Sequence, residues 1–451
     1  MKQNNPKSQR IVFFTLDALN PNIISLLIFL KKKFNVIVVT NIHLDEDYPC
    51  KHLFFNHKQT VVEKLFLMFY KNIKTRQEKE FFKRNYYRKF KVIISLLAQV
   101  KYLMSMLKLL PYYSSICKLL YSRKNYSNYI NKNDVCIIDA NLRHTLNLNP
   151  LIVYARKEAR KIFSIVYSWD NTHYSTLNRF SDGYFVWNYI NKNELIKHYN
   201  IQEEKIHISG SLMHDYLFEE EVFLKSLKNK SLQKSYSKEI RVLYAGVFPE
   251  SDEIMFEKEI NFISDLADLL KNKIPNFKII FRRYPSKGKK ILHKKLADNP
   301  LIEIFDHHNF SNIPRLGNLN ENISFERDAK KKIADFFEAD VLISAGSTYT
   351  LEFAFSNKPI LHLDANFLKN SFSKHSFFFE RLANYQHLDI LSKNLFKNII
   401  RSPEEIFNHL INLDDSILLD YNKFLSGFSR PLIKTTAKNI VLKIISEESL
   451  N

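Results

Sequence analysis

Short runs of apolar residues alternate with longer segments of mixed polarity along the first half of the chain. The runs are rich in Val, Ile and Phe, which favour strands, and they lie at residues 11–16, 36–40, 135–139, 163–167, 183–187 and 206–209. The segments between them, at 22–33, 150–160 and 191–199, have the apolar spacing of helices. Apolar strands that alternate with helices predict a parallel sheet covered on both faces.

The same alternation begins again after a polar stretch rich in Lys, Ser and Glu at 218–238, which we interpret as a linker. The predicted strands are 242–245, 277–281, 302–305, 341–343 and 360–363, and the predicted helices are 257–272, 328–337, 348–355 and 431–446. A chain of 451 residues is too long for one ordinary core. We therefore predict the α/β class, with two Rossmann-like, doubly wound domains at 1–225 and 240–425 and a closing helix in 430–451.

A long, basic helical insert at 60–130 interrupts the first series. Between residues 61 and 130 there are 15 Lys and Arg against 3 Glu, so this segment supplies 12 of the 20 net positive charges of the chain. Two interpretations are open: a helical subdomain with a solvated basic face, or an amphipathic surface that docks on anionic lipid. Nucleic-acid binding is least favoured, because the sequence lacks zinc-ligand spacing and RNP-like aromatic motifs.

The segment from Ala339 to Asp364 carries the most informative motif. It reads as a strand, a tight turn at Gly346, a helix and a second strand, in a chain with only 7 glycines. Glycine permits a backbone to approach a ligand closely, and the N–H groups of a helix start suit a phosphate. Ser347 and Thr348 add hydroxyls, and Glu352 lies where a carboxylate can accept the hydroxyls of a ribose. The motif favours a nucleotide site, with a simple serine cap at a helix start as the alternative.

A second group of polar residues follows the strand at 163–167. It supplies an aromatic ring (Trp169), a carboxylate (Asp170), an amide (Asn171) and an imidazole (His173). These groups suit a sugar or its acceptor hydroxyl, which Asp170 or His173 could deprotonate as general base. The alternative is a polar loop that caps the next helix while Trp169 packs in the core.

Two strand ends in the second half add further candidates. Gly246 follows the strand at 242–245 and would let that loop approach a ligand closely. Arg282 and Arg283 follow the strand at 277–281, where a guanidinium could neutralise a diphosphate leaving group. Ordinary turns and a surface arginine are the alternative interpretation.

Several classes of protein are disfavoured by what the sequence lacks. The P-loop, dinucleotide-binding and nucleophile-elbow glycine motifs are absent, which argues against a P-loop NTPase, a simple dehydrogenase and an α/β-hydrolase. Three widely spaced cysteines form neither a disulfide framework nor a metal site, so we expect a reducing compartment and no metal. Uncharged apolar runs such as 92–100 are shorter than the about 18 residues of a membrane span. We therefore expect a cytoplasmic protein, or one peripheral to the inner membrane.

Four motifs in this order resemble a known group of proteins. They are Ser-Trp-Asp-Asn at 168–171, Val-Trp-Asn at 186–188, Lys-Ile-His-Ile-Ser-Gly-Ser at 205–211 and Ser-Thr-Tyr-Thr-Leu-Glu-Phe-Ala-Phe-Ser-Asn-Lys-Pro-Ile at 347–360. Over 135–365 the chain is similar to bacterial surface-carbohydrate biosynthesis proteins of the GT-B glycosyltransferase superfamily, whose architecture CDP-glycerol glycerophosphotransferases and UDP-GlcNAc 2-epimerase share. The resemblance implies two Rossmann-like domains facing across a cleft, with the nucleotide donor in the second and the closing helix crossing back to the first.

The resemblance also implies roles for individual residues. The turn at 346–348 and Glu352 match the family's phosphate and ribose contacts. Arg282 lies where many relatives have an arginine before a proline, although Tyr284 here stands where a histidine is common. Asp17 ends the first strand, at a place where such enzymes often face the acceptor.

The resulting hypothesis is a metal-independent glycosyltransferase without a cofactor. It would move a sugar from a nucleotide-activated donor to a cell-surface polysaccharide or lipid-linked glycan, with Asp170 as general base and His173 and Asp17 as further candidates. A CDP-glycerol-type polyol-phosphate transferase and a nucleotide-sugar epimerase are the alternatives on the same fold. A non-catalytic binding partner for a glycan or nucleotide-sugar is the alternative of another class. The insert at 60–130 is the expected contact with an anionic inner-membrane surface, and no nucleic-acid partner is expected.

Overall fold

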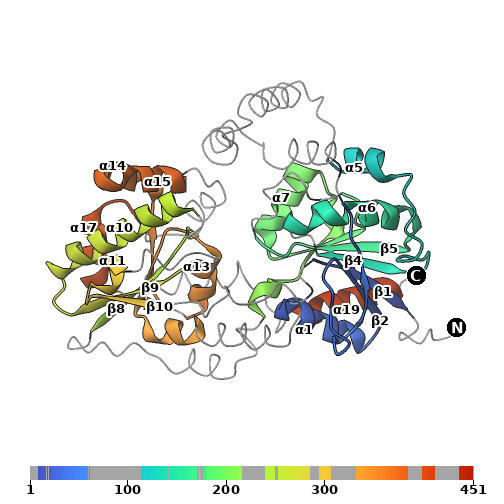
Figure 1. Ribbon diagram of the computed structural model, residues 1–451, viewed down its shortest axis with the longest axis horizontal. Helices are drawn as coiled ribbons and strands as arrows, with labels where there is room; N and C mark the ends of the chain where they lie inside the picture. Colours follow the sequence, from blue (N-terminus) through green and yellow to red (C-terminus); the bar gives the residue numbers. More distant parts are fainter. Residues whose placement is uncertain are drawn as a thin grey trace, which may run out of the picture. The chain divides into compact units, whose positions relative to one another are not determined.

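The computed structural model describes residues 9–16, 18, 20–58, 60, 113–139, 142–169, 172, 177, 179–215, 239–248, 252–284, 294–305, 332–356, 358–383, 399–411 and 436–449. The chain folds as two compact units. Unit 1 is Met1–Asp215, Leu316–Asn318 and Phe428–Asn451, and unit 2 is Tyr216–Arg315 and Leu319–Gly427. Each unit is built around one sheet (Figure 1).

Unit 1 contains a seven-stranded sheet in the order β3-β2-β1-β4-β5-β6-β7. The strands are β1 (Arg10–Phe14), β2 (Asn35–Thr40), β3 (Lys51–Phe54), β4 (Val135–Asp139), β5 (Lys161–Ile165), β6 (Gly183–Val186) and β7 (Ile206–Ile208). Every neighbouring pair is parallel, and in the middle of the sheet Ile11 lies beside Val36 of β2 and Val135 of β4.

After Arg10, strand β1 is apolar at every position from Ile11 to Phe14. Ile11 and Phe13 belong to one core cluster together with side chains of α1 (Pro21–Lys31) and α19 (Thr436–Ser449). Val12 and Phe14 belong to the cluster that contains side chains of α6 (Leu142–Glu158). Successive side chains of a strand point to opposite faces, so a sheet covered on both faces needs apolar residues at every position.

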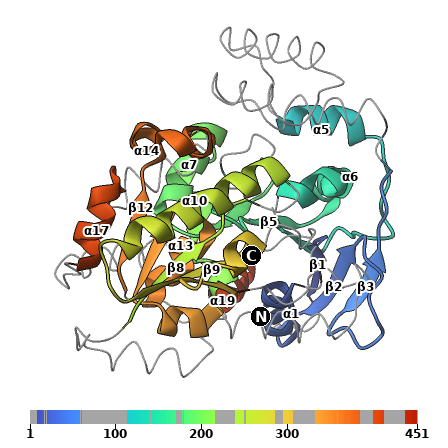
Figure 2. The ribbon, with the colours of Figure 1, turned by 60° about the vertical axis from the view of Figure 1, so that its left-hand side comes forward.

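Helix α19 joins unit 1 from the far end of the sequence. The Asp215 carboxylate accepts the backbone N–H groups of Thr436 and Ala437 at 2.8 and 2.9 Å, which caps the start of α19. Ile440 and Ile444 are buried in the same core as α1, and the two helices lie side by side (Figure 1, Figure 2). The remaining helices of unit 1 are α5 (Tyr113–Tyr121), which packs on α6, and α7 (Tyr189–Tyr199).

Unit 2 contains a six-stranded sheet in the order β10-β9-β8-β11-β12-β13. The strands are β8 (Ile240–Ala245), β9 (Phe277–Arg282), β10 (Ile302–Phe305), β11 (Val341–Ser344), β12 (Ile360–Leu363) and β13 (Ile399–Ile400), and all neighbouring pairs are parallel. The helices are α10 (Glu253–Lys271), α11 (Lys294–Ala297), a helical segment at 332–338, α13 (Thr348–Phe353), α14 (Ala365–Ser371), α15 (Ser376–Ala383) and α17 (Pro403–Ile411).

These two parallel sheets with flanking helices confirm the predicted fold class of two Rossmann-like, doubly wound α/β domains. Helix α10 starts four residues before the predicted helix at 257–272, because the Asp252 side chain accepts the N–H of Met255 at 3.4 Å and caps the helix there. Most of the predicted basic insert, residues 61–112, and the predicted linker at 218–238 lie outside the described residues. Within the described part of the chain, no helix combines the length and the apolar character of a membrane span, and no cluster of three metal-ligating side chains occurs.

Candidate functional site

The strand order of the unit 2 sheet reverses between β8 and β11, which are neighbours in space but not in sequence. In open α/β sheets, ligands bind outside the carboxyl ends of the strands at such a switch point. Two loops leave the sheet there: residues 246–248 follow β8, and residues 345–347 follow β11. Because Ile343 pairs with Tyr244, both loops begin at the same edge of the sheet.

The predicted glycine turn occupies this edge. Gly346 has a φ angle of 93°, a left-handed conformation that glycine adopts without steric cost. The Gly346 N–H donates to Ser344 Oγ at 3.0 Å, and the Ser347 N–H donates to Thr350 Oγ1 at 3.2 Å. These two N–H groups, which the sequence predicted to bind a phosphate, therefore donate their hydrogen bonds within the turn. Helix α13 has only 6 residues, so its dipole is a small contribution.

The Ser347 hydroxyl is the polar group of the turn that has no hydrogen bond among the described residues, and its oxygen is buried. Ser347 and Thr350 are arranged as in a capping box, yet the Thr350 N–H donates to the Ser347 carbonyl oxygen at 3.0 Å. A buried hydroxyl without a partner costs free energy. A ligand bound at the switch point would supply the missing hydrogen-bond partner of the Ser347 hydroxyl and offset this free energy.

The loop after β8 is held by a buried carboxylate that sequence analysis missed. Glu259 of α10 is fully buried and accepts the N–H of Val247 at 2.9 Å, the N–H of Phe248 at 3.2 Å and the hydroxyl of Tyr244 at 3.2 Å. Burial raises the pKa of the Glu259 carboxyl to about 7, against the effect of these three donors. A charged residue at a core position of an amphipathic helix is the only signal of this role in the sequence.

Gly246 allows the β8 loop to pack against the end of β9. A Cβ atom at this position would lie 3.0 Å from the Tyr284 backbone nitrogen and 3.3 Å from the Arg282 carbonyl oxygen. The Gly246 N–H donates to that carbonyl at 2.8 Å. The close approach predicted for Gly246 is thus made to the protein's own backbone.

Glu352, the predicted ribose ligand, lies on α13 and is 3% exposed. Its two carboxylate oxygens accept hydrogen bonds from Lys332 Nζ at 3.1 and 3.0 Å. The exposed fractions of the two side chains are 21% for Lys332 and 4% for Glu352, so this ion pair is largely shielded from solvent.

Arg282, the predicted diphosphate ligand, ends β9 and is buried. Its guanidinium pairs with the buried Asp335 carboxylate and lies 5.4 Å from the centre of the Tyr349 ring. Lys332 Nζ lies 5.9 Å from the centre of the same ring. Two cations, two carboxylates and one tyrosine therefore form a cluster between the 332–338 helix, α13 and the end of β9.

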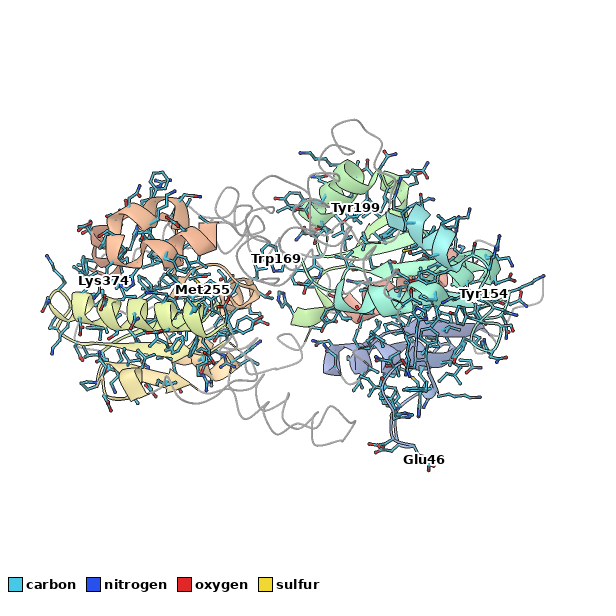
Figure 3. The ribbon with its side chains drawn as sticks, turned by 45° about the horizontal axis from the view of Figure 1, so that its top comes forward. Glu46, Tyr154, Trp169, Tyr199, Met255 and Lys374 are labelled. Atoms are coloured by element: carbon cyan, nitrogen blue, oxygen red, sulfur yellow. The ribbon has the colours of Figure 1, made fainter. Side chains whose placement is uncertain are left out.

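In unit 1, the second predicted constellation is described only in part. Asp170, Asn171, His173 and Asp17 lie outside the described residues, so their predicted roles stay predictions. Trp169, labelled in Figure 3, is 3% exposed, which favours the alternative that its ring packs in the core.

The loop after Trp169 is tied to α7 by buried polar groups. The side-chain amide of Asn191 donates to the Trp169 carbonyl at 3.0 Å, and the Tyr199 hydroxyl donates to the Thr172 carbonyl at 3.1 Å. The Thr172 hydroxyl donates to the Glu194 carboxylate. These contacts hold the loop against α7, whose N-terminus is capped by Asn188 and not by a described residue of the loop.

The strand order of unit 1 reverses between β1 and β4. At their carboxyl ends the Thr15 hydroxyl donates to Asp139 Oδ2 at 3.0 Å, and both residues are buried. The sequence did not predict this contact, because Asp139 stands at the end of an apolar run and was interpreted only as part of a strand.

Neither a protein-family model nor a curated protein matches the chain. Among solved structures it is similar to UDP-GlcNAc 2-epimerase from Neisseria meningitidis bound to UDP-GlcNAc, with 12% identity over 97% of this chain and 99% of that chain and a TM-score of 0.44. It is similar to MnaA of S. aureus with UDP, at 12% identity over 98% and 97% of the chains and a TM-score of 0.45. It is also similar to the wall teichoic acid polymerase TagF, at 14% identity over 100% and 92% and a TM-score of 0.39. Likenesses of this size assign no activity, and the fold class rests on the strand order of the two sheets.

Proposed function

We propose that this protein is an enzyme that acts on a nucleotide-activated sugar, with the nucleotide bound at the carboxyl edge of the unit 2 sheet. The observation that carries the proposal is the Gly346 turn at the switch point of that sheet. Its Ser347 hydroxyl is buried and, among the described residues, has no hydrogen bond. A phosphate oxygen is a suitable acceptor for this hydroxyl.

Glu352 gives the same edge a group for the ribose. Its carboxylate lies one turn into α13 and can accept two hydroxyl donors. Arg282 supports the proposed site through its pairing with Asp335, which holds the end of β9. Electrostatic stabilisation of a departing phosphate by fixed cations needs no metal ion.

Within this class, we propose transfer of the sugar to a cell-surface polysaccharide or lipid-linked glycan. Asp170 is the proposed general base, with His173 and Asp17 as further candidates. An epimerase would use the same nucleotide site and need no acceptor.

A thermal-shift panel tests the nucleotide site. UDP-, CMP-, CDP- and GDP-linked sugars are added to the wild type, to Ser347→Ala and to Glu352→Gln, with Ser373→Ala, an exposed serine of the same unit, as matched control. A donor at about 100 times its Kd stabilises the protein that binds it by about 2.7 kcal/mol. The wild type and the control are expected to shift with the same donor, and the two site variants to lose the shift. Equal shifts in all four proteins would refute the site.

An assay with the labelled donor then separates the reactions. Conversion of the donor to its epimer, with the nucleotide still attached, identifies an epimerase, and incorporation of label into acceptor membranes identifies a transferase. Binding without turnover across an acceptor panel identifies a non-catalytic partner. Asp170→Ala is expected to abolish transfer without weakening donor binding, and near-normal transfer by this variant would rule out Asp170 as the base.

A further inference from the structure

The carboxylate proposed for the ribose is already occupied by a cation of the protein. Both oxygens of Glu352 accept from Lys332 Nζ, and the Glu352 side chain is only 4% exposed. Each oxygen keeps a second lone pair, but the carboxylate is almost wholly covered, so the hydroxyls of a ribose can reach it only if a covering group such as the Lys332 ammonium moves aside. The pair is therefore either a purely structural contact or one that opens when a ligand binds.

Two features favour a pair that opens, and the neighbouring arginine lacks the second. A shielded ion pair is weak support for stability, because removing two charges from water offsets most of their attraction. Lys332 is 21% exposed and carries its charge on a flexible stem, so its ammonium can turn toward a new acceptor. The neighbouring Arg282 differs in this respect, since its guanidinium is buried and fixed by Asp335.

We propose that Lys332 exchanges partners when a nucleoside diphosphate binds: Glu352 takes the ribose hydroxyls, and the Lys332 ammonium takes a phosphate oxygen. The inference rests on the proposed nucleotide site and adds a determinant of specificity to it. A nucleoside without phosphates displaces the ammonium and offers it no new acceptor. A nucleoside diphosphate displaces it and provides one, so Lys332 makes the site select phosphorylated ligands.

The test compares the Kd values of uridine, UDP, cytidine and CDP for the wild type and for Lys332→Met. Lys374→Met is the matched control, because Lys374 (labelled in Figure 3) pairs with Asp265 at 2.7 Å in the same unit and is 76% exposed. In Lys332→Met, the loss of one charge-assisted hydrogen bond is expected to raise the Kd of the nucleoside diphosphate by about tenfold. The nucleoside is expected to bind as tightly as to the wild type or more tightly, and the control is expected to leave the ratio of the two Kd values unchanged.

If the ratio of the nucleoside Kd to the diphosphate Kd is the same in Lys332→Met as in the wild type, the exchange is overturned and the nucleotide site still stands. A wild type that binds none of these four ligands and is stabilised by no donor of the thermal-shift panel would overturn the proposed site and the exchange together. Lys332→Arg guards against misfolding of the methionine variant. An arginine grips a carboxylate with two parallel hydrogen bonds, so this variant is expected to bind the nucleoside several-fold more weakly than the wild type. Unchanged nucleoside binding by Lys332→Arg would also contradict the exchange.

Discussion

The buried Glu259 carboxylate makes the stability of unit 2 depend on pH. Burial raises the pKa of Glu259 from its ordinary 4.5 to about 7. Between these values the unfolded chain has lost the proton while the folded protein retains it, so the free energy of unfolding falls as pH rises. At about 1.4 kcal/mol for each pKa unit, unit 2 is expected to lose about 3 kcal/mol between pH 4.5 and 8 through this one group.

Glu259→Gln removes the ionisation and keeps the shape of the side chain. An amide has one oxygen, so it can satisfy only part of the set formed by the N–H groups of Val247 and Phe248 and the Tyr244 hydroxyl. One lost hydrogen bond is expected to make the variant about 1–3 kcal/mol less stable than the wild type at pH 5. As pH rises to 8 the wild type loses its advantage, so the two free energies of unfolding converge or cross.

The assay is urea unfolding at several pH values from 5 to 8, each followed by a short deuterium pulse at one fixed pH. Peptides of α10 and β8 then report the unfolding of unit 2. Both tryptophans of the chain, Trp169 and Trp187, lie in unit 1, so tryptophan fluorescence provides an internal control that Glu259→Gln is expected to leave unchanged. Parallel pH profiles of the wild type and Glu259→Gln in unit 2 would refute the reasoning.

Three further predictions test other contacts. Asp215→Ala removes the cap of α19 and is expected to lower the stability of unit 1 by about 1–2 kcal/mol in fluorescence-detected unfolding. Asp252→Ala removes the cap of α10 in unit 2 and is expected to leave the fluorescence transition unchanged. Equal effects of the two variants on this transition would count against the cap by Asp215. Gly346→Ala places a Cβ at a φ of 93° and is expected to cost about 1–2 kcal/mol in unit 2, and an unchanged deuterium-pulse profile would contradict this. Tyr199→Phe deletes the hydrogen bond to Thr172 and is expected to cost about 1 kcal/mol in unit 1, a result that unaltered fluorescence unfolding would exclude.

The strands and the glycine turn were accessible from sequence because their signals are local. Strand β1 is apolar at successive positions, which is what a doubly covered parallel sheet requires. Gly346 stands directly between an apolar run and a helix start. Ser344 and Thr350, which bond the N–H groups of the turn, were within reach of the same logic, because hydroxyl side chains close to a turn often bond its backbone.

The partners of the charged groups were not accessible, since they are far apart along the chain. Glu352 and Lys332 are separated by 20 residues, Arg282 and Asp335 by 53, and Asp215 and Thr436 by 221. The types and positions of Glu352 and Arg282, together with the family resemblance, predict a ligand for each. Only the folded chain pairs them with Lys332 and Asp335, which changes how each can take part in binding.

The central claim is that a nucleotide-activated sugar binds at the carboxyl edge of the unit 2 sheet. Hydrogen exchange with and without the donor that stabilises the protein tests this claim most directly. Slower exchange is expected in the peptides that cover residues 245–248 and 344–353, which contain the two loops at the switch point and α13. Slower exchange confined to unit 1, with both of these peptides unchanged, would contradict it.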